Sequence, residues 1–193
     1  MKEASAVKRR TLSALALLAL TACSSAPAPK PAPPLPAPPP SSVRQAEAAL
    51  ASASSSLVSG RVVVLPVAQG VRLTGTVGGL RPGGSFGFHV HERGDCSAVD
   101  ASSAGAHFNP TASAHGRGAA GPHHLGDMDN LVADGEGVAH FDRVLGGVSL
   151  GTGLPNDVLG KALIVHADPD DYRSQPSGNA GARLACGVIR ASR

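Results

Sequence analysis

The sequence has very few aromatic residues: no tryptophan, one tyrosine and four phenylalanines among 193 residues. Aromatic side chains bury large apolar areas, so a core without them is small and usually needs disulfides or metals as cross-links. The chain instead has 24 glycines, and its apolar residues are mostly valine, leucine and alanine. This composition favours short strands joined by glycine-rich loops over a helix bundle.

Charge of one sign is also missing from most of the chain. The formal net charge of +3 comes from residues 1–22, which hold four basic residues and one acidic residue, and the remainder holds 13 of each sign. A nucleic-acid-binding domain normally carries a basic patch or stripe, so no nucleic-acid partner is expected. No basic run follows residue 22, which argues against membrane binding by charge alone.

Cysteine occurs only three times, and the first cysteine lies at the end of a leader-like segment. Residues 1–22 have a charged start, an apolar run from Leu12 to Leu20 and the ending L-T-A-C, which resembles the lipobox of bacterial lipoproteins. The run is too short for a membrane-spanning helix. We expect a signal peptide cleaved before Cys23, which then carries a lipid anchor in an exported protein facing the periplasm or the cell exterior. An ordinary leader that leaves Cys23 free is the alternative.

Residues 24–42 are dominated by proline and alanine, which favour an extended polyproline II spacer. Residues 43–56 are rich in alanine and are expected to form a short, weakly held helix. Residues 23–56 are therefore predicted to be a lipidated tether, and residues 57–193 the folded domain.

Short apolar segments separated by turn signals follow from Leu57 onward. Strands are expected at 57–67, 71–77, 85–91, 130–133, 137–142, 161–166 and 184–190, with a hairpin at 134–136. The pattern, about eight strands without helical periodicity, predicts an all-β antiparallel sandwich or barrel. Two long segments, 92–128 and 167–182, lack a strand pattern and are expected to be functional loops.

The sequence G-F-H-V-H at 87–91 places two histidines on one face of a strand. His89 and His91 are two residues apart and point the same way, whereas Phe88 and Val90 point into the core. Neutral imidazole is a good ligand for transition metals. An H-x-H on an exposed strand can arise by chance, but further candidate ligands follow in glycine-rich surroundings: His107, His115, His124, Asp127 and His166. Together they predict a two-metal site.

Five blocks of sequence resemble the copper/zinc superoxide dismutase family. They are G-F-H-V-H-x-x-G-D-C, S-A-G-A-H-F-N-P, H-L-G-D, L-I-V-H and G-N-A-G-A-R-L-A-C-G-V-I, in this order between residues 58 and 193. The resemblance implies an eight-stranded Greek-key β-sandwich or barrel of immunoglobulin-like type. It also implies copper and zinc as cofactors and the superoxide anion as substrate.

Carried over to this chain, the resemblance assigns copper to His89, His91, His107 and His166, and zinc to His107, His115, His124 and Asp127. Three imidazoles and a carboxylate suit a closed, four-coordinate zinc site. The resemblance further implies that Asp170 links a copper ligand to a zinc ligand, that Arg183 attracts the anion, and that Cys96 and Cys186 form a disulfide. A solvated loop acid at Asp170 and a purely structural Arg183 are the competing interpretations.

Two histidines are not expected to bind metal. His123 neighbours His124, but the family register and the nine-residue step from His115 select His124. His140 alternates with Phe141 along a strand and fits no ligand block, so it is expected to be a surface or packed residue.

The predicted activity is the dismutation of superoxide to oxygen and hydrogen peroxide by a copper ion bridged to zinc through His107, outside the cytoplasm. Catalytic roles are expected for His107 and Arg183. An extracytoplasmic copper- and zinc-buffering protein on the same scaffold is the alternative. Loop 167–182 has Arg173 as its only basic residue and lacks the charged run of the animal enzymes. How the anion is steered is therefore open, and monomer and homodimer are both compatible with the sequence.

Overall fold

A computed structural model describes residues 41–118 and 121–192, which belong to a compact unit, Ala37–Arg193. The predicted signal peptide, Cys23 and nearly all of the proline-rich tether lie outside the described residues. No helix in the described ranges is long and apolar enough to cross a membrane.

The regular secondary structure of the described residues consists almost entirely of antiparallel β-strands. These are β1 (Ala46–Ser52), β2 (Ser59–Val67), β3 (Gly70–Gly78), β4 (Ser85–Phe86), β5 (Phe88–His91), β6 (Leu131–Val132), β7 (Ala139–Gly146), β8 (Ala162–His166), β9 (Arg183–Val188) and β10 (Arg190–Ala191), with one short 3₁₀ helix, η1 (Ser102–Ala104). Because β4 and β5 are separated only by Gly87, and β9 and β10 only by Ile189, the ten segments correspond to eight interrupted strands.

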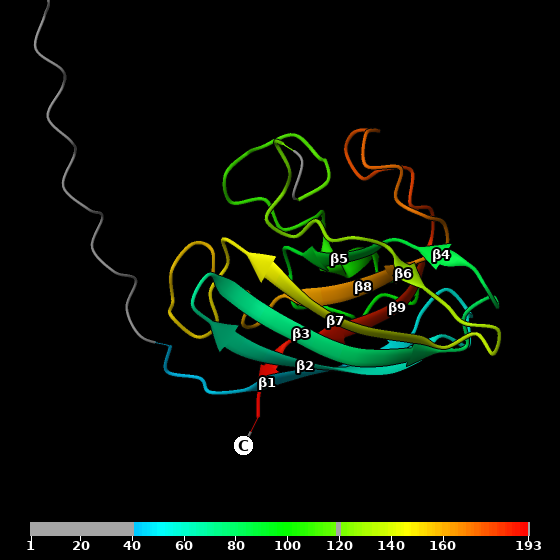
Figure 1. The fold of residues 1–193 in the computed structure, drawn as a ribbon, viewed down its shortest axis with the longest axis horizontal. Helices are drawn as coiled ribbons and strands as arrows, with labels where there is room; N and C mark the ends of the chain where they lie inside the picture. The colour runs from blue at the N-terminus through cyan, green and yellow to red at the C-terminus, as the bar shows by residue number, and fades with distance from the viewer. Residues whose placement is uncertain (1–40, 119–120, 193) are drawn as a thin grey trace, which may run out of the picture. The chain divides into compact units, whose positions relative to one another are not determined.

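The strands form a curled sheet in the order β5-β8-β9-β1-β2-β3-β7, with β4 and β6 as a separate pair. Figure 1 shows β1, β2, β3 and β7 lying side by side as one layer, with β5, β8 and β9 forming the other. Strand β7 pairs with β3 and β9 with β1, so sheet neighbours are not chain neighbours, as in a Greek key. The predicted all-β Greek-key class is confirmed.

Strands β5 and β8 are buried on both faces. Their inner face carries Phe88, Val90, Leu163 and Val165, which belong to the main apolar core. Their outer face carries His89, His91 and His166, which are also buried, because the long loops cover this side of the sheet. The period of two that separates His89 and His91 from Phe88 and Val90 is therefore present in the structure.

The helix expected within residues 43–56 is wrong, because Ala46–Ser52 form strand β1. Ala46, Ala48 and Leu50 point into the core at a spacing of two, and β1 pairs with β2 on one side and with β9 and β10 on the other. Tertiary pairing here overrides the helix propensity of alanine. The expected start of the domain at Leu57 is wrong for the same reason.

The hairpin predicted at 134–136 exists only as a turn. Asp134 N donates to Val138 O at 2.9 Å, and Gly137 N donates to Asp134 O at 3.2 Å. The flanking strands do not pair with each other: β6 pairs with β4, and β7 pairs with β3. At this turn the chain therefore passes from β6, which is paired with β4, to β7, which is paired with β3.

Candidate metal centre

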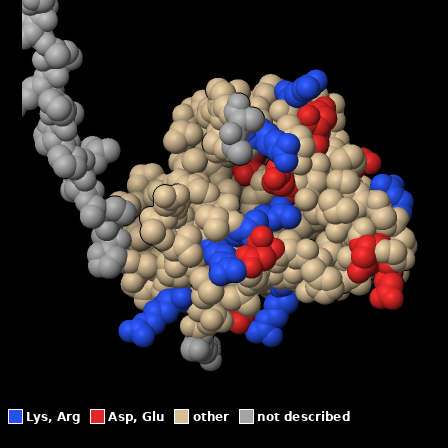
Figure 2. Space-filling model, viewed as in Figure 1, with Lys and Arg blue, Asp and Glu red and all other residues tan. Residues whose placement is uncertain are grey.

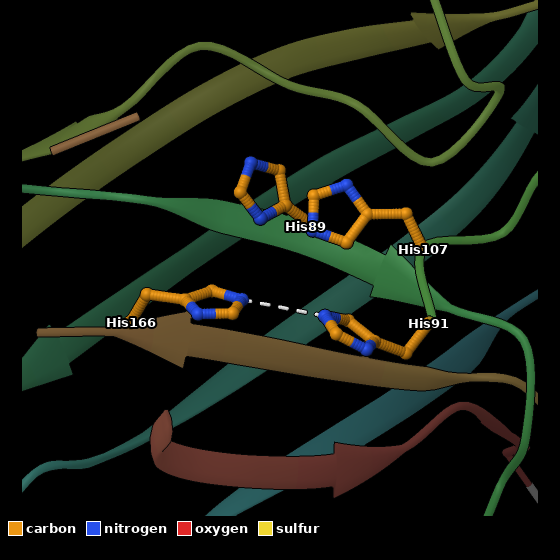
Figure 3. Close-up of side chains that lie close together, drawn as sticks. All are labelled: His89, His91, His107 and His166. Atoms are coloured by element: carbon orange, nitrogen blue, oxygen red, sulfur yellow. Dashed lines mark hydrogen bonds between the residues drawn. The ribbon is translucent and has the colours of Figure 1, made fainter. Parts of the chain in front are cut away.

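Three of the predicted ligands come from the outer face of two paired strands. His89 and His91 lie on β5 and His166 lies on β8, and β5 and β8 are hydrogen-bonded neighbours. The Nε2 atoms of His91 and His166 are 3.3 Å apart, as marked in Figure 3. One ring can donate to the other at this distance, and the contact brings two potential ligand nitrogens to one point.

The fourth histidine, His107, comes from the long loop and is held against β5 by the backbone. His107 forms an isolated bridge with His91, and Phe108 N donates to Val90 O at 2.8 Å. The ring centroids of His89 and His107 are 4.0 Å apart, and both rings are drawn in Figure 3. We call His89, His91, His107 and His166 the first set; each offers a ligand atom within 4.8 Å of the others.

His107 also belongs to a second set, together with His115, His124 and Asp127, whose ligand atoms satisfy the same limit of 4.8 Å. Asp127 is central to this set. Its Oδ1 lies 2.8 Å from His107 Nδ1, and its Oδ2 lies 3.0 Å from His115 Nδ1. Its carboxylate also accepts hydrogen bonds from the backbone N–H groups of Gly116 and His124. All eight ligand positions predicted for copper and zinc, counting His107 twice, therefore lie in these two sets.

The unsatisfied nitrogens show that the two sets fit metal ions. Among the described residues, four buried ring nitrogens form no hydrogen bond: His89 Nδ1, His107 Nε2, His115 Nδ1 and His124 Nδ1. The last two lie 3.0 and 3.3 Å from the carboxylate of Asp127, but not in hydrogen-bond geometry. Buried polar atoms are nearly always paired, and an unprotonated imidazole nitrogen is a common metal ligand. Because His107 Nδ1 faces Asp127 and the second set, its orphaned Nε2 is the atom left for the first set.

The other ring nitrogens are occupied by groups that orient the rings. His89 Nε2 lies 2.8 Å from Asp170 Oδ2, and His115 Nε2 lies 2.9 Å from Asp170 Oδ1. Asp170 is itself buried, so the solvated-loop interpretation of this residue is wrong. Backbone carbonyls take the same part for the two remaining rings of the first set: Gly105 O lies 2.9 Å from His91 Nδ1, and Gly181 O lies 3.3 Å from His166 Nδ1. Partners of this kind fix both the ring orientation and the tautomer of metal-binding histidines.

Burial keeps the first set neutral. It lowers the pKa of His89 to about 4 and that of His166 to about 3, and it lowers the pKa of His91 well below its ordinary value, with further lowering from the neighbouring histidines. Neutral imidazole is the form that binds metal, so protons do not compete for these sites near pH 7.

In the second set, His115 and His124 differ, because burial lowers the pKa of His124 whereas that of His115 is raised. Burial disfavours the charged form of His115, but contacts with Asp127 and Asp170 outweigh it and raise the pKa of His115 to about 9. Burial alone would raise the pKa of Asp127, yet its contacts with His107 and His115 hold that pKa well below the ordinary range. Both carboxylates are thus ionised, and a cation in the second set would replace the proton on His115.

A cavity of about 690 Å³ opens onto the first set and is lined by residues of both long loops. His91, His107 and His166 line it, and Arg183 is the only cation among the described residues of its lining. The guanidinium of Arg183 donates to Ala101 O and Gly105 O, both at 2.7 Å. Arg183 therefore both faces the cavity and holds the segment around η1, so the structural and functional interpretations are compatible.

The predicted disulfide between Cys96 and Cys186 is confirmed, with a Cα–Cα distance of 5.8 Å across a sequence separation of 90 residues. It ties the loop before η1 to strand β9. Since Arg183 is also on β9 and bonds to the same loop, the disulfide and the guanidinium hold one wall of the cavity together.

The two histidines expected not to bind metal lie outside both sets. His140 is exposed on β7, with its Nδ1 3.0 Å from Thr76 Oγ1. His123 is partly exposed and its Nδ1 lies 2.8 Å from Gly121 O.

Sequence reasoning missed the groups that act through backbone atoms. The carbonyls of Gly105 and Gly181 left no signal, because any residue supplies a carbonyl. Asn130 and Gln175, whose side chains bond to the backbone of Asp170 and His115 respectively, were missed because isolated amide residues in loops carry no pattern.

The sequence is similar to known proteins over most of the folded domain. A family model described as "Copper/zinc superoxide dismutase (SODC)" matches residues 58–189. "Superoxide dismutase [Cu-Zn] 2" of Aquifex aeolicus (strain VF5) is 41% identical over 137 residues, covering 69% of this chain and 80% of the relative. "Superoxide dismutase-like protein YojM" of Bacillus subtilis (strain 168) is 39% identical over 124 residues, covering 63% of each chain.

Solved structures give the same result. The crystal structure of the clock protein EA4 matches with a TM-score of 0.69 and 37% identity, over 78% of this chain and 96% of that chain. A SOD-like protein from Bacillus subtilis matches with a TM-score of 0.67 and 35% identity, over 73% of this chain and 95% of the other. Copper and zinc are the family's cofactors, and the two ligand sets described above suit both ions. The chain belongs to the copper/zinc superoxide dismutase family.

Proposed function

We propose that the protein dismutates superoxide to oxygen and hydrogen peroxide, with copper held by the first set and zinc by the second. The observation that carries this proposal is the position of His107. Its Nδ1 faces Asp127 in the second set, while its buried Nε2 has no hydrogen-bond partner and faces the first set. A metal buffer needs ligands but has no need of one ring shared between two unlike sites.

Bound copper would supply the electron chemistry, accepting an electron from one superoxide and returning one to a second. Four imidazoles suit such an ion in both oxidation states. The chain's own residues bind the anion, orient it and supply a proton. Two superoxide anions and two protons give one oxygen and one hydrogen peroxide, so proton delivery is part of the reaction.

Arg183 is suited to binding and orienting the anion, because its charge stands at the wall of the cavity above the first set. Its side chain is fixed by the two hydrogen bonds to Ala101 and Gly105, so little freedom is lost when an anion binds. His107 Nε2 borders the same cavity and can hold a proton destined for peroxide. With zinc held at His107 Nδ1 and by Asp127, Nε2 would be the ring nitrogen left to carry that proton.

Steering by a strongly basic surface is not expected on the face seen in Figure 2, where basic and acidic side chains are interspersed. Within the cavity, Arg183 is the basic side chain available to attract the anion, and Glu92 is an acidic residue of the same lining. Field focusing in such a cleft raises association rates by about 10- to 1,000-fold.

We predict that Arg183→Gln lowers the second-order rate of superoxide decay by at least about tenfold, because the cavity loses its cation. The measurement is stopped-flow decay of superoxide by protein loaded with copper and zinc, with the metal content determined for each sample. The rate of the variant should also depend less on salt than that of the wild-type protein, an effect that a purely structural role of Arg183 would not produce.

Arg173→Gln is the matched control, because Arg173 is exposed in the neighbouring loop and is not among the residues lining the cavity. Its rate should stay within about twofold of the wild-type rate. An equal loss in both variants would reject the role given to Arg183. A wild-type protein that retains both metals without dismutating superoxide would reject the proposed activity and favour metal buffering.

We further propose that the protein acts outside the cytoplasm, anchored by lipid on Cys23. The proposal is supported by the leader-like segment ending in L-T-A-C, and superoxide is an anion that crosses membranes poorly. Labelled palmitate supplied to bacteria expressing the full chain should enter the wild-type protein and Ser24→Ala, but not Cys23→Ala. Label in none of the three proteins would contradict the anchor.

A further inference from the structure

Gln175, in the loop between β8 and β9, forms a reciprocal pair of hydrogen bonds with the backbone of His115. His115 N donates to Gln175 Oε1 at 2.8 Å, and Gln175 Nε2 donates to His115 O at 2.9 Å. The carboxamide thus pairs with both backbone groups of a single residue. The ring of that residue contacts Asp127 of the second set and also Asp170.

The segment just before Gln175 is a turn held mainly by Asp171. The carboxylate of Asp171 accepts hydrogen bonds from Arg173 N and Ser174 N at 2.9 and 2.8 Å, and from the Ser174 hydroxyl at 2.6 Å. Tyr172 N also donates to Asp170 Oδ1 at 2.7 Å, so the turn contacts the carboxylate that lies against His115. Gln175 adds the hydrogen bonds from this loop to the backbone of His115.

The residues just after Gln175 belong to the wall of the cavity. Pro176 and Ser177 line this cavity, as does Arg183. A shift of Gln175 would move these two residues directly, since they are its chain neighbours. The side chain of Gln175 thus connects the backbone of His115, a member of the second set, to the cavity wall formed by Pro176 and Ser177.

A second carboxamide ties the same loop to the metal sets from the other direction. Asp170 N donates to Asn130 Oδ1 at 2.9 Å, and Asn130 Nδ2 donates to Asp170 O at 3.0 Å. Asn130 holds the start of the loop, at the carboxylate that contacts His89 and His115. Beyond residue 174 the loop is held within itself, because Gly178 N donates to Ser174 O at 2.7 Å and Asp171 N donates to Gly178 O at 2.9 Å. Gln175 is the side chain that joins this segment to the backbone of His115.

We propose that Gln175 is a positioning residue that couples zinc binding in the second set to the order of the cavity wall formed by Pro176 and Ser177. An ion that fixes the ring of His115 also fixes its backbone, and the carboxamide passes this order to the loop. The inference rests on the zinc assignment made above for His115, and it does not require the dismutase activity.

The test uses the full chain loaded with zinc alone and compares the wild-type protein with Gln175→Met, which keeps the length of the side chain but forms neither hydrogen bond. Zinc affinity is measured by competition with a chromophoric chelator. Loop order is measured by the rate of trypsin cleavage after Arg173, an exposed residue two positions before Gln175, with the fragments identified by mass.

Zinc should protect the Arg173–Ser174 bond in the wild-type protein. In Gln175→Met, zinc affinity should fall about tenfold, as is typical when a group supporting a metal ligand is lost. Cleavage after Arg173 in the zinc-saturated variant should be about tenfold faster. Cleavage after Arg93, which is exposed in the other long loop, should stay unchanged, which separates loop release from general unfolding.

Gln45→Met is the matched control, since Gln45 bonds to Glu47 and Ser192 on the β1 side of the domain; it should behave as wild type. Gln175→Glu keeps the acceptor for His115 N but loses the donor, so intermediate effects are expected, and this variant decides the result if Gln175→Met does not fold. Wild-type zinc affinity and protection in both Gln175 variants would overturn the coupling alone. A wild-type protein that binds no zinc would overturn the metal assignment and the coupling with it.

Discussion

Gly178 shows how closely single residues of the loop fit the metal sets. Its backbone has a φ of +65°, and a Cβ atom there would lie 1.8 Å from Asp170 Oδ1 and 2.8 Å from His115 Nε2. Neither atom belongs to a flexible chain end, because the carboxylate and the ring hold each other at 2.9 Å. Glycine is therefore required both for the left-handed backbone and for the contact between Asp170 and His115.

We predict that Gly178→Ala weakens zinc binding at least about tenfold, because the added methyl group displaces Asp170 from His115. Gly83→Ala is the control: Gly83 has the same φ of +65°, but a Cβ atom added there would have no neighbouring atom within 4 Å. That variant bears the left-handed backbone cost of about 1–2 kcal/mol without the clash. Equal zinc affinity of the two variants in chelator competition would contradict this account.

At the scale of residues, the ligands were predictable and their supports were not. His89, His91, His107, His115, His124, Asp127 and His166 have side chains whose chemistry is specific to metal binding, and their spacing follows a known family. Gly178 and Gln175 act through steric fit and backbone contacts, which depend on segments far away in the chain. Such contacts exist only in the folded state, so no local sequence pattern predicts them.

At the scale of elements, β1 is the main departure from the sequence-based expectation. Its composition, A-E-A-A-L-A-S, favours a helix when taken alone. In the fold it lies between β2 and β9, where its hydrogen bonds and the burial of Leu50 decide its structure. The strands β2, β3, β5 and β8 were predictable because their valine, leucine and phenylalanine residues already favour strands.

We predict that a protein beginning at residue 57 does not fold, whereas one beginning at residue 41 does. Loss of β1 exposes β2 and β9 along their edges and removes Ala46, Ala48 and Leu50 from the core. The expected loss of stability exceeds about 5 kcal/mol, the lower range for a whole domain. Circular dichroism and urea unfolding of the two purified proteins check this prediction. Cooperative unfolding of the protein that begins at residue 57 would show that β1 is dispensable.

At the scale of the whole molecule, the buried histidines on the outer face of β5 and β8 make the stability of the metal-free protein depend on pH. His89 and His166 have pKa values of about 4 and 3 in the fold, against about 6.5 when unfolded. Between these values the unfolded state binds more protons than the folded state, so stability falls as the pH is lowered through this window. The raised pKa of His115, about 9, acts in the other direction: its contribution is complete below about pH 6.5 and is lost progressively as the pH rises from there to about 9.

We predict that the metal-free protein is most stable near about pH 6.5 and loses about 1.4 kcal/mol per pH unit for each of His89 and His166 as the pH falls below 6.5. His166→Gln should flatten this acid slope, because one buried neutral imidazole is gone. His140→Gln should not, because His140 is exposed. Urea unfolding at pH 7.5, 5.5 and 4.5 gives the slopes. An equal slope for His166→Gln and the wild-type protein would reject this account.

For the whole molecule, part of the function could be predicted from the sequence and part could not. The family, its cofactors and the disulfide followed from motifs that span most of the folded domain. The route by which superoxide reaches the first set did not, because it depends on how the two long loops close over β5 and β8. Arg183, at the start of β9, lies at the wall of the cavity that the loops form, and basic and acidic side chains are interspersed on the face seen in Figure 2.

The central claim is that one imidazole, that of His107, joins the two metal positions. The most direct test is a crystal structure of the protein loaded with copper and zinc, with anomalous scattering recorded at both absorption edges. We expect copper at His107 Nε2, beside His89, His91 and His166, and zinc at His107 Nδ1, beside Asp127. A ring that contacts neither ion, or two ions that share no ligand, would contradict the account.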